Sequence, residues 1–441
     1  MDAEKKKGSK RRAGELAQPS CSLVGLGSLF AQTPGDFAVI VHGDPDCANP
    51  FLKVFPHRLV PDLEDVYLGT HRFYCTDLSE IDVAAGKGTQ RLLECARVVM
   101  KAANPGRLFL IGTCLSEMVG EDLDILAQEV EEAIGVPTVG LSAGGLRLKT
   151  QAQLLDRFGQ LMLEPSLANG PSISSGVTML GYAPLRRWEK EEFQSLLSAM
   201  GVTLLAELPG RASEEQWAAG GKASLLVVSD SDAWPGVTGL LASTGTKILE
   251  SPPPVGAAAA ARFFDSINEA VGGTGGHAAG LAELWGRAGA SMAPQLDRLR
   301  GCKVAYCIGS IKNYEAGQLA LEGLGDIPAF VDLGMEVEVL VQERDDQQSH
   351  ERVQRNLAAL GIELPYRNFN DPGVLGEALR GGSFDLAYCQ DHLKGQAMQA
   401  GLPYVRFGAM RPGAAGMITN SLILVGAISE GFQGRYGRLL R

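Results

Sequence analysis

The cysteines are the residues of this 441-residue chain with the most chemistry to offer, and five of the eight fall in the first 114 residues. Cys21, Cys47 and Cys114 stand in three separate loop contexts, and no Cys-x-x-Cys pair is present, which disfavours a zinc ribbon or a thioredoxin-like motif. Thiolates are the soft, charge-donating ligands that iron–sulfur clusters require. Spacing alone leaves two interpretations open, which are cluster ligands and buried structural thiols. Three ligands would need a fourth from elsewhere, such as a second chain.

Cys47 follows an apolar run in the stretch VIVHGDPDCANP. The pattern predicts a strand that ends in a tight polar turn, with Gly43 as its first turn residue. His42 could donate a hydrogen bond near a cluster, or it could be a half-buried histidine with satisfied nitrogens. Carboxylates beside an anionic cluster would be repelled, so we expect Asp44 and Asp46 to turn toward backbone amides or solvent.

Other polar residues near these cysteines have simpler interpretations. Cys75 is expected to be a neighbouring buried thiol, and Cys95, on the apolar face of a helix, to be part of the core. The acidic segment that contains Asp77, Glu80 and Asp82 could supply a general acid or base. Charge at a helix N-terminus is the interpretation we favour for it.

Two further thiols lie late in the chain, where Cys307 and Cys389 each end an apolar strand-like run and His392 follows three positions after Cys389. Because ligands bind at the carboxyl ends of parallel strands, both thiols are expected to face one cleft. A second metal or substrate site, including a possible second cluster, is one hypothesis. Two ordinary strand-end thiols are the other. Cys302 begins the strand and is predicted to be structural.

These residues depend on elements that alternate between strand and helix. Residues 37–43 and 107–114 read as buried strands, residues 88–106 and 116–137 as amphipathic helices, and residues 137–141 as the next strand. A βαβ rhythm of this kind predicts a doubly wound parallel sheet.

The rhythm breaks and restarts twice, near residues 165–175 and near the glycine- and alanine-rich stretch at 271–280. The predicted fold class is therefore α/β, with three Rossmann-like, doubly wound parallel-sheet domains. We expect the following organisation: a disordered basic tail at 1–17, an α/β domain with Cys21, Cys47 and Cys114 at 18–168, and α/β domains at 169–285 and 286–441.

Composition excludes several classes of function. The net charge of −11 and a pI near 5.2 disfavour a nucleic-acid or anionic-membrane surface. No apolar run approaches the roughly 18–20 residues of a membrane span, and no secretory signal follows the basic tail, so we expect a cytoplasmic protein. No GxxxxGK[ST] phosphate loop occurs, so this chain is not expected to hydrolyse ATP itself.

The residues that flank the N-terminal cysteines carry a family resemblance. In order along the chain, HGDPDC, CTDLSEIDVAAG and TCLSEMVGEDL resemble three signatures of the nitrogenase component 1 superfamily, the last of them closest to the nitrogenase β-type subunit. The resemblance implies that Cys21, Cys47 and Cys114 ligate an iron–sulfur cluster, either P-cluster-like or [4Fe-4S]. It further implies that a homologous sister subunit shares the cluster in an α2β2 heterotetramer, and that a separate nitrogenase-reductase-like ATPase supplies electrons.

The C-terminal half bears on which branch of the superfamily this is. Catalytic nitrogenase subunits hold their large cofactor with one cysteine and one histidine, but the matching strand end here carries Ser229 and Asp230, and VRFGAMRPGAAGM contains no histidine. We therefore expect a subunit of a nitrogenase-like, ATP-dependent oxidoreductase that relays electrons to a small substrate, such as an organosulfur compound. The alternatives are a scaffold for nitrogenase cofactor assembly, a tetrapyrrole reductase subunit, and a cluster-free α/β binding protein.

Overall fold

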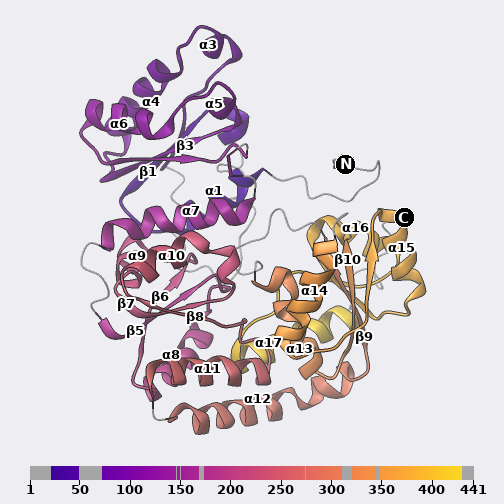
Figure 1. The fold of residues 1–441 in the computed structure, drawn as a ribbon. Coiled ribbons are helices and arrows are strands. Elements are labelled where there is room, and N and C mark those ends of the chain that lie inside the picture. Colours follow the sequence, from indigo (N-terminus) through magenta and orange to yellow (C-terminus); the bar gives the residue numbers. More distant parts are fainter. Residues whose placement is uncertain are drawn as a thin grey trace, which may run out of the picture.

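The structure is a computed structural model in which three parallel sheets follow one another along the chain (Figure 1). The predicted basic tail at 1–17 lies outside the described residues. Those residues are 21–48, 72–145, 147–148, 150–167, 173–273, 275–309, 320–342 and 347–429.

The first sheet has the strand order β2-β1-β3-β4, with every neighbouring pair parallel. Alternate residues of β1 face opposite layers: Val39 and Val41 pack toward α1 and α7, and Ala38 and Ile40 pack toward α4 and α6. Both faces are thus buried, as a doubly wound sheet requires. Its elements are α1 (Ser22–Gln32), β1 (Phe37–His42), β2 (Phe73–Cys75), α3 (Glu80–Ala84), α4 (Gly88–Ala102), β3 (Arg107–Gly112), α5 (Cys114–Met118), α6 (Leu123–Ile134), β4 (Thr138–Ser142) and α7 (Gln151–Leu163).

The second sheet has the order β6-β5-β7-β8 and is also parallel. Val177 and Val227 face α8 and α11, whereas Leu226 and Val228 face α9 and α10. Its elements are β5 (Ile173–Leu180), α8 (Arg187–Ala199), β6 (Thr203–Leu208), α9 (Glu214–Gly220), β7 (Ala223–Val228), α10 (Pro235–Ser243), β8 (Lys247–Glu250) and α11 (Ala257–Val271).

The third sheet is parallel with the order β11-β10-β9-β12-β13, and the long helix α12 leads into it. The C-terminal helix α17 then returns to pack against α12 and α8 (Figure 1). The elements are α12 (His277–Leu299), β9 (Lys303–Ile308), α13 (Ile327–Asp332), β10 (Glu336–Gln342), α14 (Gln347–Leu360), β11 (Tyr366–Phe369), α15 (Pro372–Gly381), β12 (Leu386–Cys389), α16 (Lys394–Gln399), β13 (Tyr404–Arg406) and α17 (Gly413–Ser429).

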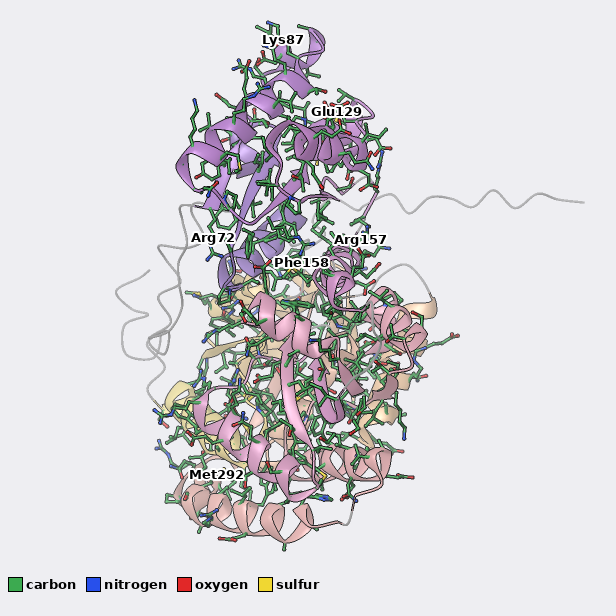
Figure 2. The ribbon with its side chains drawn as sticks, turned by 90° about the vertical axis from the view of Figure 1, so that its left-hand side faces the viewer. Arg72, Lys87, Glu129, Arg157, Phe158 and Met292 are labelled. Atoms are coloured by element: carbon green, nitrogen blue, oxygen red, sulfur yellow. The ribbon has the colours of Figure 1, made fainter. Side chains whose placement is uncertain are left out.

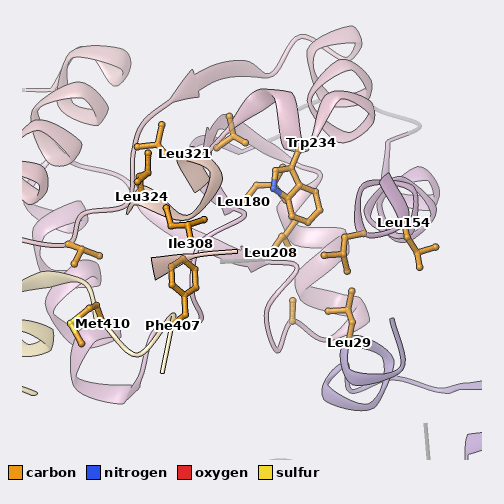
Figure 3. Close-up of a cluster of buried hydrophobic side chains, with 14 of the residues drawn as sticks. Leu29, Leu154, Leu180, Leu208, Trp234, Ile308, Leu321, Leu324, Phe407 and Met410 are labelled. Carbon is orange, nitrogen blue, oxygen red and sulfur yellow. The ribbon is translucent and has the colours of Figure 1, made fainter. Parts of the chain in front are cut away.

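One apolar core joins the three sheets. Figure 3 shows Leu154 from α7 together with Leu180 and Trp234 from the second sheet and its connections, and with Ile308 and Phe407 from the third. Phe158 marks the junction between the first and second sheets (Figure 2), since its ring centroid lies 4.9 Å from Phe30 and 5.7 Å from Trp217. The sheets are therefore held against one another by buried surface.

A buried ion pair fastens the C-terminal segment to the second sheet's layer. Arg411 Nε donates to Glu189 Oε1 at 2.9 Å, and both residues are buried. Glu192, one turn along α8, accepts the N–H groups of Ala414 and Ala415 at 2.8 and 3.0 Å and so caps α17. Removing one partner of such a buried pair costs about 3–5 kcal/mol, because the other charge is left uncompensated.

The predicted α/β class with three parallel sheets is confirmed, but one helix prediction is wrong. Residues 116–137 do not form a single helix: α5 ends at Met118 and α6 begins at Leu123. Gly120 takes a φ of 78°, and Asp122 caps α6 by accepting the N–H groups of Asp124 and Ile125. The predicted domain boundaries stay predictions. Within the described residues, no helix is both long and apolar enough to cross a membrane.

Candidate functional site

The three N-terminal cysteines lie at the carboxyl edge of the first sheet and its adjoining helix α1. Cys21 is the N-cap of α1, Cys47 lies in a helical turn after β1, and Cys114 is the first residue of α5 after β3. Burial first, and then the charges of Cys21 and Cys114, raise the pKa of Cys47 to about 11. The pKa of Cys114 is likewise raised, first by burial and then by Cys21. Cys21, Cys47 and Cys114, which are distant in sequence, thus form one site, which we call the cysteine triplet.

Two glycines allow the backbone segments of this edge to approach closely. A Cβ atom on Gly43 would lie 2.2 Å from Thr113 Oγ1 and 2.9 Å from its Cβ. A Cβ atom on Gly144 would lie 2.6 Å from the backbone nitrogen of Cys114 and 2.7 Å from its Cα. Since real Cβ atoms do not come this close to backbone, Gly144 lets the connection after β4 press against Cys114.

Side-chain contacts hold that connection in place. The Cys114 thiol donates to the carbonyl of Gly144 at 2.6 Å, and Glu117 Oε1 accepts the N–H of Gly144 at 3.1 Å. The same Glu117 carboxylate lies close enough to Cys114 to raise the pKa of its thiol. Burial and the nearby carboxylate disfavour the thiolate form. A positive ion at the cysteine triplet would favour the thiolate instead.

His42 is fully buried beneath the same edge. Its Nδ1 lies 3.2 Å from Thr76 Oγ1 and its Nε2 lies 3.0 Å from Glu121 Oε2. The Thr76 hydroxyl accepts the N–H of Gly43 at 3.0 Å, and the Thr113 hydroxyl donates to the carbonyl of His42 at 3.0 Å. His42 therefore links the ends of β1, β2 and β3, the strands at or after whose ends Cys47, Cys75 and Cys114 lie.

The acidic residues near the site are explained by local structure. Asp44 accepts the N–H of Asp46 at 2.7 Å, and both residues are exposed, as the sequence predicted. Asp82 forms a capping box with Ser79 at the start of α3, and these hydrogen bonds hold the pKa of Asp82 below its usual value. The prediction of helix N-terminal charge is correct for Asp82.

The described residues do not form a ready-made site for a single metal ion. Among the described residues, no three His, Cys, Asp or Glu side chains are grouped closely enough to hold one metal ion. A cluster gives each iron its own thiolate, so its ligands stand farther apart than those of a mononuclear site. Cys21 and Cys114 are exposed and Cys47 is half-buried, so a cluster could reach all three sulfurs from outside the sheet.

The late thiols have different surroundings, and the predicted cleft is wrong. Cys307 and Cys389 pair in register on β9 and β12, but both are 1% exposed and belong to the apolar core under α15 and α16. Burial raises the pKa of Cys389 to about 12. His392 lies beside Gly309, where a Cβ atom on the glycine would be 2.3 Å from Nε2. Within the part of the chain that the structure describes, these two thiols therefore face the apolar core and not an open cleft.

The residues at the positions that match the cofactor ligands of nitrogenase make local contacts that stabilise the fold. Ser229 is buried and donates to the carbonyl of Gly181 at 2.9 Å. Asp230 accepts the N–H groups of Asp232 and Ala233 at the start of a 3-10 turn. The segment without histidine contains Arg411, whose guanidinium is paired with Glu189 as described above.

Sequence reasoning missed the residues that shape the site. Gly144, Thr113 and Glu117 were not singled out, although Gly144 stands in a Gly-Gly pair that begins three residues after the predicted strand at 137–141. That pair was the available signal, because glycine after a strand often marks a close backbone approach.

The fold defines the class of protein: it is an α/β protein with three doubly wound parallel sheets and with cysteines at the edge of the first. A family model described as "Nitrogenase component 1 type Oxidoreductase" matches residues 21–411, and the chain belongs to this family. Its members typically bind iron–sulfur clusters and are usually multimeric with a reductase partner.

Curated relatives of this chain include proteins named nitrogenase iron-molybdenum cofactor biosynthesis protein NifE. The one from Klebsiella pneumoniae is 28% identical over 169 residues, which cover 35% of this chain and 37% of the relative. The one from Nostoc sp. is 24% identical over 431 residues, covering 92% of this chain and 84% of the relative. The first alignment thus spans well under two thirds of the relative's length.

Solved nitrogenase structures share the fold. The structure of nitrogenase Cp1 at pH 6.5 superposes with a TM-score of 0.70 at 18% identity, covering 98% of this chain and 96% of the other. At pH 5 the same protein gives a TM-score of 0.69, with 96% and 90% covered.

Proposed function

We propose that this chain is a subunit of a scaffold on which a nitrogenase-type iron–sulfur cofactor is assembled. The observation that carries the proposal is the convergence of Cys21, Cys47 and Cys114 at one sheet edge, from three separate connections. The near full-length similarity to the Nostoc NifE protein favours assembly over turnover. Ser229 and the histidine-free segment around Arg411 argue against a catalytic nitrogenase subunit and are compatible with either function.

In this proposal the three thiolates hold an iron–sulfur cluster at the edge of the first sheet. When bound, such a cluster accepts and gives up single electrons. The chain's own part is to fix the sulfurs: Gly43 and Gly144 set the approach of the backbone, and Thr113 and Thr76 fasten the strand ends. Loading requires each thiol to lose its proton, which the raised pKa of Cys47 opposes in the empty protein.

A homologous sister subunit would cover this edge. Cys21 and Cys114 are exposed, and Met118 and Val119 at the end of α5, four and five residues after Cys114, are exposed apolar residues, at 74% and 49%. Exposed apolar residues on the same short helix as an exposed thiol are unfavourable in water and suit a protein partner. We expect an α2β2 heterotetramer, served by a separate nitrogenase-reductase-like ATPase.

The second candidate is an ATP-dependent reductase that acts on a small organosulfur or tetrapyrrole substrate. The match to a family of oxidoreductases and the nitrogenase-like fold favour it. In that case a cluster on the same cysteine triplet would relay electrons, and the partner chain or this one would bind the substrate.

One experiment separates the two functions. The chain would be purified with its sister subunit without oxygen and then mixed with the reductase and ATP. A scaffold transfers its assembled cofactor to a cofactor-free nitrogenase, and activity appears only after that acceptor is added. Turnover of a small substrate in the absence of any acceptor would instead support the reductase.

A further inference from the structure

We propose that Glu121 is a positioning residue of the cysteine triplet. Through His42, its carboxylate fixes the turn that carries Cys47 relative to α5, the helix that begins with Cys114. The inference rests on the proposed function, since the group that the triplet would hold is the iron–sulfur cluster. It adds no ligand to the cluster and names a residue that orients two of the three ligands we infer.

Glu121 belongs to the same chain segment as Cys114. The chain turns back after α5 at Gly120, whose φ is 78°. The N–H of Glu121 donates to the carbonyl of Ser116 at 3.1 Å, and the Ser116 hydroxyl donates to the carbonyl of Thr113 at 3.0 Å. The backbone of Glu121 is therefore tied to α5 and, through it, to the residue that precedes Cys114.

The carboxylate of Glu121 meets the imidazole of His42, the last residue of β1. His42 Nε2 lies 3.0 Å from Glu121 Oε2, and the side chain of His42 is fully buried while that of Glu121 is 19% exposed. Both atoms are buried, and neither has another polar partner within the part of the chain that the structure describes. Since a buried polar atom without a partner is unfavourable, each group depends on the other to hold its place.

The other nitrogen of the imidazole leads to Cys47. His42 Nδ1 lies 3.2 Å from Thr76 Oγ1, which also accepts the N–H of Gly43 at 3.0 Å. Gly43 opens the turn to Cys47, so contacts run without a gap from Glu121 through His42 and Thr76 to that turn. Because Glu121 is tied to α5, these side chains join the connections that follow β1 and β3.

The N-terminus of α4 leaves room for the carboxylate. A Cβ atom on Gly88, the first residue of α4, would lie 2.3 Å from Glu121 Oε1 and 3.8 Å from His42 Nε2. The Lys87 side chain at the N-cap position does not cap α4, and a negative charge near a helix N-terminus is favourable. Glycine at position 88 therefore lets β1, α4 and the connection between α5 and α6 meet at one carboxylate.

Asp265 offers a matched control. Its Oδ1 lies 2.9 Å from Nε2 of His277, a histidine that is 2% exposed, so this pair repeats the contact of Glu121 with His42, although Asp265 is itself more exposed. The pair joins α11 to α12 beside the second sheet and not the connections that carry the cysteines. Its loss is therefore expected to affect stability alone.

The test uses the full chain with its sister subunit, purified without oxygen, in the variants Glu121→Ala, His42→Asn, the double variant and Asp265→Ala. Asparagine keeps a polar atom near the position of Nδ1 for Thr76 and lacks the Nε2 atom that meets Glu121. Iron affinity is measured by competition with a chelator, and electron paramagnetic resonance spectra are recorded after dithionite reduction. Denaturant unfolding of the iron-free proteins measures stability.

We expect Glu121→Ala to lower iron affinity by about tenfold, the lower end of what removing a residue that orients metal ligands costs, and to change the reduced spectrum. His42→Asn should do the same, and the double variant should be no worse than either, because the two residues act in one chain of contacts. Asp265→Ala should lower stability and leave affinity and spectrum unchanged.

Wild-type affinity and spectrum in Glu121→Ala would overturn the proposal, as would additive losses in the double variant. So would an equal loss of affinity in Asp265→Ala, because affinity would then follow stability alone. If Glu121→Ala does not fold, His42→Asn is compared with Asp265→Ala in its place. Cys47→Ala separates the two proposals: if it abolishes the cluster while Glu121→Ala keeps wild-type affinity, only this inference fails, and if it keeps the cluster, the proposed function fails.

Discussion

The first and third sheets both carry cysteines at the carboxyl ends of parallel strands, but only the first presents them at its edge. On β9 and β12 the thiols of Cys307 and Cys389 are part of the strands themselves, and helices α15 and α16 cover them. Cys47 and Cys114 instead follow β1 and β3 by a few residues and stand beyond the strands' last hydrogen bonds.

The difference shows what a strand-end cysteine needs in order to act as a ligand. A thiol inside a doubly wound sheet points into a helix layer whichever face it takes, since both faces are buried. A thiol in the connection after the strand can leave those layers, provided that tight turns bring neighbouring connections together. Gly43 and Gly144 provide that approach on the first sheet.

Among the variants that probe the contrast between the first and third sheets, Cys114→Ala is expected to have the largest effect. Removing this thiolate should cost most of the bound iron, because an iron without its thiolate is exposed at the edge of the sheet. Iron and sulfide analysis of the anaerobic protein measures the loss. Retention of the full wild-type iron content would place Cys114 with the structural thiols of the third sheet.

Gly144→Ala should come next. Its new Cβ atom would lie 2.6 Å from the Cys114 nitrogen, so the connection after β4 must shift, at a cost of about 1–3 kcal/mol. We expect a lower unfolding midpoint in denaturant and a partial loss of iron. Gly239→Ala, on α10 with open space around it, is the control and should be neutral or slightly stabilising. Equal behaviour of the two variants would argue against close approach as the device that builds the site.

A smaller effect is expected from pH. The pKa of Cys47 is raised to about 11 in the empty protein, so binding iron displaces a proton at neutral pH. Higher pH removes that proton in advance, and iron affinity should rise by up to about tenfold per pH unit for each thiol deprotonated on binding. Competition with a chelator between pH 7 and 8.5, corrected for the chelator's own protonation, measures the trend. Affinity that is flat or falls over this range would contradict thiol ligation.

The smallest effect is expected from Cys389→Ala. Loss of a buried sulfur from the core under α15 and α16 should cost on the order of 1 kcal/mol of unfolding free energy. Iron content should not change. A parallel drop in iron would mean that the third sheet holds metal after all, and would remove the contrast with the first.

Much of the fold could be predicted because hydrophobic runs and turn residues report local structure. The strands at 37–43 and 107–114 match β1 and β3 closely, and the helix at 88–106 matches α4. The helix predicted at 116–137 was wrong. The amphipathic pattern continues across Gly120, but the helical backbone is interrupted there by the positive φ of that glycine.

The site was harder to predict because it depends on contacts between distant segments. Proximity of Cys21 to Cys47, the register of Cys75 against Val41, and the approach of Gly144 to Cys114 are products of sheet order. Likewise, an apolar run that ends in a cysteine looks the same in sequence whether the cysteine lies beyond the strand, as Cys114 does after β3, or within it under a helix layer, as Cys307 does.

The central claim is that the cysteine triplet holds an iron–sulfur cluster. The most direct measurement is the iron and acid-labile sulfide content of the wild-type chain with its sister subunit, purified without oxygen, beside Cys47→Ala. The account predicts about four or more irons per chain, with matching sulfide, for the wild type and near-complete loss of both in the variant. Iron near zero in the wild type, or iron unchanged by Cys47→Ala, would contradict it.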